Sequence, residues 1–233
     1  MKLTHLIPAS GKAVRLSGIP KFLLPIPNES NLLTHHIKLS VENLNADNVK
    51  VATNNLFSEI LLNLNFEKHL KKLLNIEIFE TNTMNETLLN MRDVDSQIHM
   101  VTMPDTYISD KNLITKMKEL LLTSPDIDCV LGLWRIKDKQ REKIGQCLTN
   151  NGLIVDVVDK NKDVKYDFLW GTVLFKNTLW EFINKDDPHI GYSFKPAIDN
   201  GLKLSFVLAE GRYYDCGTVD EYWEMVREVN YEQ

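Results

Sequence analysis

The sequence predicts an α/β domain with a largely parallel central sheet. Short apolar runs that suit buried strands alternate with longer stretches in which apolar residues recur at helical spacing. No linker rich in Pro, Gly or Ser divides the chain, and no internal repeat is present. With 233 residues the chain can bury one sizeable core, so we expect residues 1–233 to form a single domain.

The alternating elements follow one another from the first residues onward. Runs of aliphatic and β-branched residues predict strands at Leu3–Ile7, Val49–Thr53, Ile76–Glu80, Gln97–Met103 and Asp128–Trp134. The stretches between them predict helices at Thr34–Leu44, Leu56–Leu74 (as one helix or two), Glu86–Val94 and Leu113–Leu122. Because strands and helices alternate, we expect neighbouring strands to run parallel.

After Gly145 the pattern changes. Asn-Gly and charged turns separate short predicted strands at Gln146–Leu148, Ile154–Val158 and Gly171–Phe175. A late strand is predicted at Leu204–Leu208 and a closing helix at Val219–Tyr231. This part of the chain therefore predicts hairpins that extend the sheet in antiparallel fashion.

The composition excludes several classes of partner. The chain is 43% hydrophobic and 25% charged with a net charge of −5, which gives no broad attraction to nucleic acid or to an anionic membrane. No run approaches the roughly twenty apolar residues of a membrane span. Pro8 interrupts the first apolar stretch, so no signal peptide is expected. The widely spaced Cys129, Cys147 and Cys216 lack a metal-binding rhythm and suit a reducing cytoplasm, where we expect the protein to reside.

A loop of small residues follows the first predicted strand. Its backbone N–H groups can face an anion, and Arg15 and Lys21 bring positive charge to the same place. Such a loop can also be only a tight turn beside solvated charges. It has neither the Gly-Lys-Ser/Thr ending of a Walker loop nor the three-glycine dinucleotide fingerprint. We interpret it as a polyphosphate site formed by Ala9, Ser10, Gly11, Lys12 and Ala13.

Two aspartates stand at the ends of predicted strands. Asp105 follows an apolar strand, and Asp215 ends the strand-like stretch before the closing helix. Carboxylates at the carboxyl ends of strands are where Mg²⁺ and phosphate sites assemble in open sheets. Either residue could instead be a turn or helix-cap residue. The residue pattern alone does not pair them.

These motifs, in this order, resemble the sugar-phosphate nucleotidyltransferases. The stretch Ala9–Leu16 is similar to the family's opening loop, and Pro20-Lys21-Phe22-Leu23-Leu24-Pro25 to the segment that follows it. Asp105 and Asp215-Cys216-Gly217-Thr218 match the family's two metal-binding aspartates. The resemblance covers most of the chain. It implies one catalytic domain with a Rossmann-like nucleotide-diphospho-sugar transferase fold, whose mostly parallel central sheet carries a small antiparallel extension.

The resemblance also implies a role for each candidate residue. Asp105 and Asp215 would bind Mg²⁺, while Arg15 and Lys21 would be the catalytic cations. A nucleoside triphosphate would contact the loop from Ala9 to Ala13, together with Asn85 and Thr87. A phosphorylated small-molecule acceptor would contact Asp159, Lys160 and Gly171. Asn85 and Thr87 could equally cap a helix, and Gly171 could simply pack in the sheet. The resemblance further implies a homodimer.

The expected activity is transfer of a nucleotidyl group to a sugar 1-phosphate, with release of pyrophosphate, for surface-polysaccharide synthesis. One alternative is a cytidylyltransferase acting on a non-sugar phosphate such as phosphocholine. Another is a degenerate, non-catalytic binding module, because Ala13 and Val14 replace the family's Gly and Thr. A glycosyltransferase would use an Asp-x-Asp motif, and Asp93-Val94-Asp95 has that spelling but follows a predicted helix. His35 and His36 have no partner at ligand spacing and are expected on a helix surface.

Overall fold

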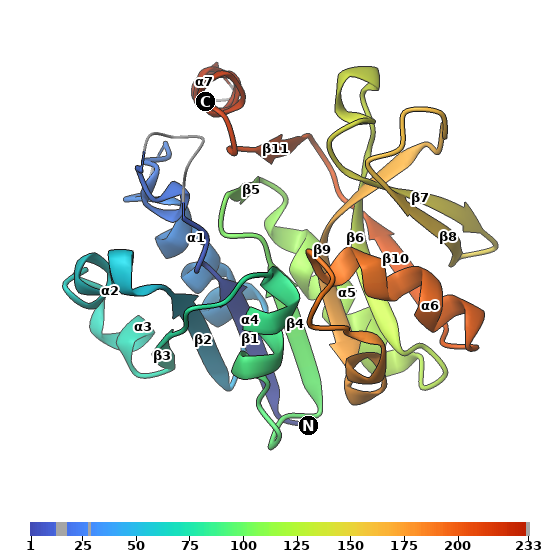
Figure 1. Ribbon diagram of the computed structural model, residues 1–233, viewed down its shortest axis with the longest axis horizontal. Coiled ribbons are helices and arrows are strands. Elements are labelled where there is room, and N and C mark those ends of the chain that lie inside the picture. Colours follow the sequence, from blue (N-terminus) through green and yellow to red (C-terminus); the bar gives the residue numbers. More distant parts are fainter. Residues whose placement is uncertain (13–17, 28, 232–233) are drawn as a thin grey trace.

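The computed structural model describes residues 1–12, 18–27 and 29–231. Strands and helices alternate along the chain as the sequence predicts (Figure 1). The strands are β1 (Leu3–Pro8), β2 (Asn48–Thr53), β3 (Leu74–Ile78), β4 (Ile98–Thr102), β5 (Thr106–Ile108), β6 (Cys129–Arg135), β7 (Gly145–Asn150), β8 (Leu153–Asp159), β9 (Phe168–Lys176), β10 (Leu204–Leu208) and β11 (Tyr213–Asp215). The α-helices are α1 (Leu32–Lys38), α2 (Asn55–Leu62), α3 (Lys68–Lys71), α4 (Met84–Met91), α5 (Lys111–Thr123), α6 (Phe194–Asp199) and α7 (Val219–Tyr231).

The described residues form a nine-stranded sheet in the order β3-β2-β1-β4-β9-β6-β10-β8-β7. The four strands from β3 to β4 are parallel, and β6 is parallel to β10. Strand β9 runs antiparallel to β4 and β6, and it also pairs with β7 in antiparallel fashion. Strands β7 and β8 are antiparallel as well. The sheet is therefore mixed, and the expected mostly parallel sheet holds only for part of it.

The correction concerns β9, which the sequence places in a peripheral extension. Its residues are almost all buried, and it occupies the middle of the sheet. A continuously apolar strand indicates burial on both faces, but it carries no information on strand direction. The sequence pattern therefore identifies the strand correctly and leaves its neighbours undetermined.

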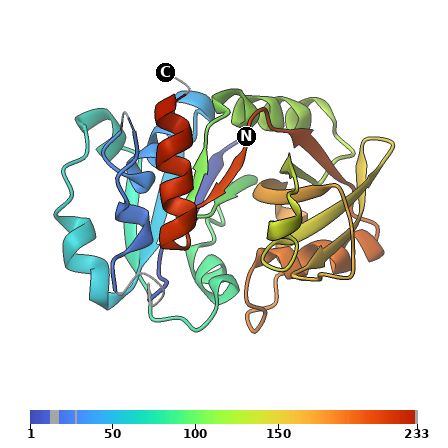
Figure 2. The same cartoon turned by 90° about the horizontal axis from the view of Figure 1, so that it is seen from above.

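Two apolar layers cover the faces of the sheet. Helices α1, α2 and α5 pack on one face, and α4 and α6 on the other. Successive residues of a strand contribute to opposite layers, so Met100 of β4 joins the first and Val101 the second. Helix α7 lies above the sheet, at the end where β5 and β11 form a separate two-stranded ladder (Figures 1 and 2). In the described part of the chain, no helix is long and apolar enough to cross a membrane.

The two adjacent histidines of α1 are buried, so the expected surface position is wrong. His35 lies 3.0 Å from Glu29 through Nδ1 and 2.9 Å from the carbonyl oxygen of Ile108 through Nε2. His36 has no exposed surface. The preceding and following apolar residues of the helix are buried as well, so this short helix is covered on most sides.

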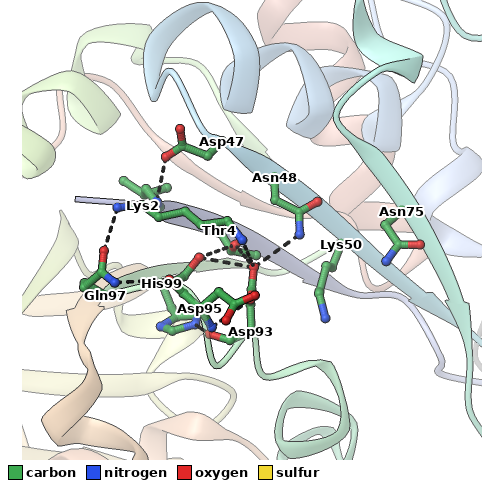
Figure 3. Close-up of polar contacts among 12 residues, drawn as sticks. Lys2, Thr4, Asp47, Asn48, Lys50, Asn75, Asp93, Asp95, Gln97 and His99 are labelled. Carbon is green, nitrogen blue, oxygen red and sulfur yellow. Dashed lines mark hydrogen bonds and ion pairs between the residues drawn. The ribbon is translucent and has the colours of Figure 1, made fainter.

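A polar cluster joins the amino ends of β1, β2 and β4 (Figure 3). The Asp93 carboxylate accepts hydrogen bonds from Thr4 Oγ1 at 2.8 Å and Ser96 Oγ at 3.2 Å, and lies 3.3 Å from Lys2 Nζ. Burial raises the pKa of Asp93, but hydrogen bonds led by the one from Thr4 outweigh this effect and hold it far below its usual range. Asp93 therefore connects the segments at the amino ends of the strands through hydrogen bonds and an ion pair, at the end of the sheet opposite Asp105. This position does not suit the metal motif of a glycosyltransferase.

Buried neutral histidines predict a loss of stability in mild acid. Burial lowers the pKa of His5 to about 3 and that of His99 to about 4. His99 Nδ1 accepts the indole N–H of Trp180 at 3.2 Å, a bond that protonation of Nδ1 would break. Between pH 6.5 and 4 these histidines bind protons in the unfolded chain but not in the folded chain. As the pH falls through this range, each histidine therefore lowers the free energy of unfolding by about 1.4 kcal/mol per pH unit.

Urea denaturation at pH 7 and pH 5 measures this loss. The variant His99→Gln should show a shallower dependence on pH than the wild type, because one of the titrating groups is gone. Equal slopes in the two proteins would contradict the assignment to His99.

Candidate active site

A cleft of about 700 Å³ opens at the carboxyl ends of the parallel strands, beside the β5–β11 ladder. Segments far apart in the sequence form its walls. They are residues 8–12, 21–22, 81–84, 103–105, 143–145, 159–160, 170–171, 188–189, 213 and 215. Most of the described residues that the sequence selects as site residues are among them.

The β5–β11 ladder brings the two candidate metal-binding aspartates together. Asp215 pairs with Thr106 in the ladder, next to Asp105, and the backbone N–H of Cys216 donates to the carbonyl oxygen of Asp105 at 2.8 Å. Lys21 Nζ lies 2.7 Å from Asp105 Oδ2. Both acids and this lysine line the same cleft. The structure thus unites three residues that the sequence pattern leaves separate.

This cluster carries an excess of negative charge. The pKa of Asp215 is raised to about 6, chiefly by burial and then by the charges of Asp105 and Glu221, although the N–H of Gly217 and the charge of Lys21 act in the opposite direction. Two carboxylates that repel each other in a cleft suit a divalent cation with oxygen ligands. Among the described residues, no group of three or more His, Cys, Asp or Glu is arranged for a metal. Two carboxylates can supply part of the oxygen ligands of a divalent cation, and phosphate oxygens of a substrate can supply others.

The opening loop contributes the predicted residues Ala9, Ser10, Gly11 and Lys12 to the cleft wall. Ala13 and Arg15 lie outside the described residues.

Asn54 holds this loop and is a residue that the sequence analysis misses. Its Nδ2 donates to the carbonyl oxygen of Ser10 at 2.8 Å, and its Oδ1 accepts the N–H of Phe57. An Asn between a strand and a helix indicates a helix cap, but its contact with the loop follows only from the tertiary structure.

The segment after β3 forms another wall, but with different residues from those expected. Residues 81–84 line the cleft, whereas Asn85 and Thr87 are fully buried behind them. Thr87 Oγ1 lies 2.9 Å from Ser10 Oγ, and Asn85 Nδ2 donates to the carbonyl oxygen of Asn184 at 3.0 Å. The helix cap is Thr83, whose Oγ1 accepts the N–H of Glu86. In this structure Asn85 and Thr87 support the wall, and a contact with a nucleotide base stays a prediction.

Another part of the cleft wall, the acceptor end, contains Asp159, Lys160 and Gly171, the residues expected to contact the acceptor. His189 also lies there, and the sequence analysis does not select it because no motif surrounds it. Gly171 is also required by packing: a Cβ atom at this position would lie 2.3 Å from Cε2 of Tyr213. Gly171 therefore has the packing role that the sequence leaves open, and it also lines the cleft.

The chain has the fold of sugar-phosphate nucleotidyltransferases. Solved structures that resemble it include a UDP-glucose pyrophosphorylase in complex with UDP-glucose, at a TM-score of 0.81 and 15% identity over 100% of both chains. A UDP-glucose pyrophosphorylase from Acinetobacter baumanii matches at 0.80 and 12% identity, covering 100% of this chain and 95% of that one. A candidate glucose-1-phosphate thymidylyltransferase from Bacillus anthracis, in complex with sucrose, matches at 0.80 and 16% identity over 97% and 94%.

No protein-family profile and no curated protein matches the sequence. At these identities the structural likeness concerns the fold. It confirms at that level the family resemblance inferred from the motifs, and the mixed sheet is part of that likeness.

Close packing at Gly171 predicts the effect of a single methyl group. The variant Gly171→Ala should lower the free energy of unfolding by about 1–3 kcal/mol, because the new Cβ overlaps Tyr213 in a closely packed region. Chemical denaturation measures the change. Gly11→Ala is the matched control for stability, since a Cβ atom there would meet no atom within 4 Å. A Gly171→Ala protein as stable as the wild type would disprove the packing argument.

Proposed function

We propose that the protein is a Mg²⁺-dependent nucleotidyltransferase that joins a nucleoside triphosphate to a sugar 1-phosphate, giving a nucleoside-diphosphate sugar and pyrophosphate. The observation that carries this proposal is the meeting of Lys21, Asp105 and Asp215 in one cleft. The fold shared with UDP-glucose pyrophosphorylase structures also supports it. We further propose that the product serves surface-polysaccharide synthesis, as the family resemblance implies, and that the protein acts in the cytoplasm, which suits its widely spaced cysteines.

The reaction needs placement and charge neutralisation more than proton transfer. An oxygen of the acceptor phosphate is already an anion, and it attacks the α-phosphorus of the triphosphate. A new P–O bond forms there while the bond to the bridging oxygen breaks, and pyrophosphate leaves with the electron pair. Lys21 would stabilise the charge that accumulates at the α-phosphate. Lys160, at the acceptor end, would orient the incoming phosphate.

Asp105 and Asp215 would hold Mg²⁺, which supplies positive charge to the triphosphate oxygens when it is bound. The position of the two carboxylates beside each other in the cleft is the property that supports this role. Arg15 would hold the departing β- and γ-phosphates, according to the family resemblance.

A phosphorylated amino alcohol such as phosphocholine is a second candidate acceptor. The carboxylate of Asp159 and the ring of Trp170 both line the acceptor end of the cleft. A carboxylate and an aromatic ring can together bind a quaternary ammonium group.

An assay of pyrophosphate release identifies the substrates. The enzyme is offered UTP, dTTP, CTP or GTP, each with glucose 1-phosphate or phosphocholine, with Mg²⁺ or with a chelator. We expect turnover with glucose 1-phosphate and one preferred triphosphate. We expect none with the chelator, since the two carboxylates would then face the triphosphate without a divalent metal ion between them. Turnover with phosphocholine alone would select the second candidate. Binding without turnover for every pair would indicate a non-catalytic module.

Removal of one charge in the cleft should affect turnover far more than stability. Asp105→Asn and Lys21→Ala should each lower kcat by about 10²–10³, the usual effect of losing one preorganised charge. Asp95→Asn is the matched control, because Asp95 belongs to the Asp-x-Asp sequence at the other end of the sheet. Circular dichroism verifies that each variant is folded. A fully active Asp105→Asn enzyme would refute the role of Asp105.

A further inference from the structure

His189 lies on a loop that hydrogen bonds join to the start of α4. The backbone N–H of Met84 donates to the carbonyl oxygen of Pro188 at 3.1 Å, and Asn85 Nδ2 donates to that of Asn184 at 3.0 Å. Met84 belongs to the wall expected to contact the nucleotide, whereas His189 faces the acceptor end. The position of the imidazole is therefore determined by the backbone of a tethered loop.

The hydrogen bonds of His189 define its tautomer. Nδ1 accepts the backbone N–H of Gly191 at 3.2 Å, so in the neutral ring the proton resides on Nε2. Nε2 lies 3.2 Å from Asp159 Oδ2 and donates to it. The imidazole is thus a fixed donor directed at one carboxylate oxygen.

The Asp159 carboxylate also lies near Tyr192. The charge of Asp159 raises the pKa of the Tyr192 phenol. An ionised carboxylate offers about four acceptor sites. His189 occupies one of these sites, and others can accept hydrogen bonds from a ligand in the cleft that Asp159 lines.

We propose that His189 is a positioning residue for the acceptor: it orients the Asp159 carboxylate so that its remaining lone pairs accept hydrogen bonds from hydroxyl groups of the acceptor sugar. This inference rests on the proposed function. It assigns no proton transfer to the imidazole, because the acceptor phosphate needs no base. His189 acts only through Asp159.

Two substitutions separate the two hydrogen bonds of the ring. In His189→Gln the amide nitrogen can replace Nε2 as the donor to Asp159, while the bond to Gly191 is lost. In His189→Asn the amide oxygen can replace Nδ1 as the acceptor from Gly191, while the donor to Asp159 is lost. His69→Gln is the control, because this exposed histidine lies on α3 and not at the cleft wall.

Calorimetric titration with glucose 1-phosphate provides the first readout. His189→Asn should weaken binding by roughly tenfold, as expected for losing one hydrogen bond to a charged group. His189→Gln should restore most of the affinity. In turnover assays the KM for glucose 1-phosphate should rise in His189→Asn, while the KM for the triphosphate and kcat change less than about twofold by the same reasoning.

The outcomes distinguish this inference from the proposed function. Unchanged binding in His189→Asn, or a greater loss in His189→Gln than in His189→Asn, would overturn the positioning role even in an active enzyme. A wild type that binds glucose 1-phosphate with the expected pattern of variants, but does not turn it over, would leave the role intact and refute the proposed reaction. A wild type that binds no glucose 1-phosphate would overturn the inference. Nitrogen-15 spectra of the histidine ring give an independent readout: they should show the proton of the neutral ring on Nε2, and a proton on Nδ1 alone would contradict the geometry.

Discussion

The short antiparallel ladder between β5 and β11 determines the chemistry of the cleft. It places Asp215 opposite Thr106, and therefore beside Asp105, although the two acids are distant in the sequence. Burial raises the pKa of Asp215, and the charge of Asp105 raises it as well. The ion pair between Lys21 and Asp105 offsets part of the negative charge. The remaining negative charge suits a cation that binds together with a triphosphate.

The two ends of the sheet use carboxylates in opposite ways. At the amino ends of the strands, the hydroxyl groups of Thr4 and Ser96 donate hydrogen bonds to the Asp93 carboxylate, and the pKa of Asp93 is lowered. At the carboxyl ends, Asp215 has fewer donors and a raised pKa. A carboxylate whose oxygens accept hydrogen bonds from the protein stabilises the fold. A carboxylate whose negative charge is only partly balanced by donors and cations can bind a ligand. The location of each acid, and not its sequence context, separates the two roles.

The sequence predicted the elements of the fold better than their neighbours in the sheet. Alternating strands and helices identified the parallel half correctly, because each pattern depends on local burial. The central position of β9 escaped prediction, since a fully apolar strand does not encode its direction. The pairing of Asp105 with Asp215 required the family resemblance. The roles of Asn54 and His189 arise from hydrogen bonds between segments distant in the sequence, which no local pattern contains.

The loop of residues 184–189 is bonded to the start of α4 on one side and carries the partner of Asp159 on the other. The loop therefore connects two parts of the cleft wall through hydrogen bonds on both of its sides. Any coupling through it between two bound molecules would be reciprocal by thermodynamic linkage, and would change the affinity for each by the same factor.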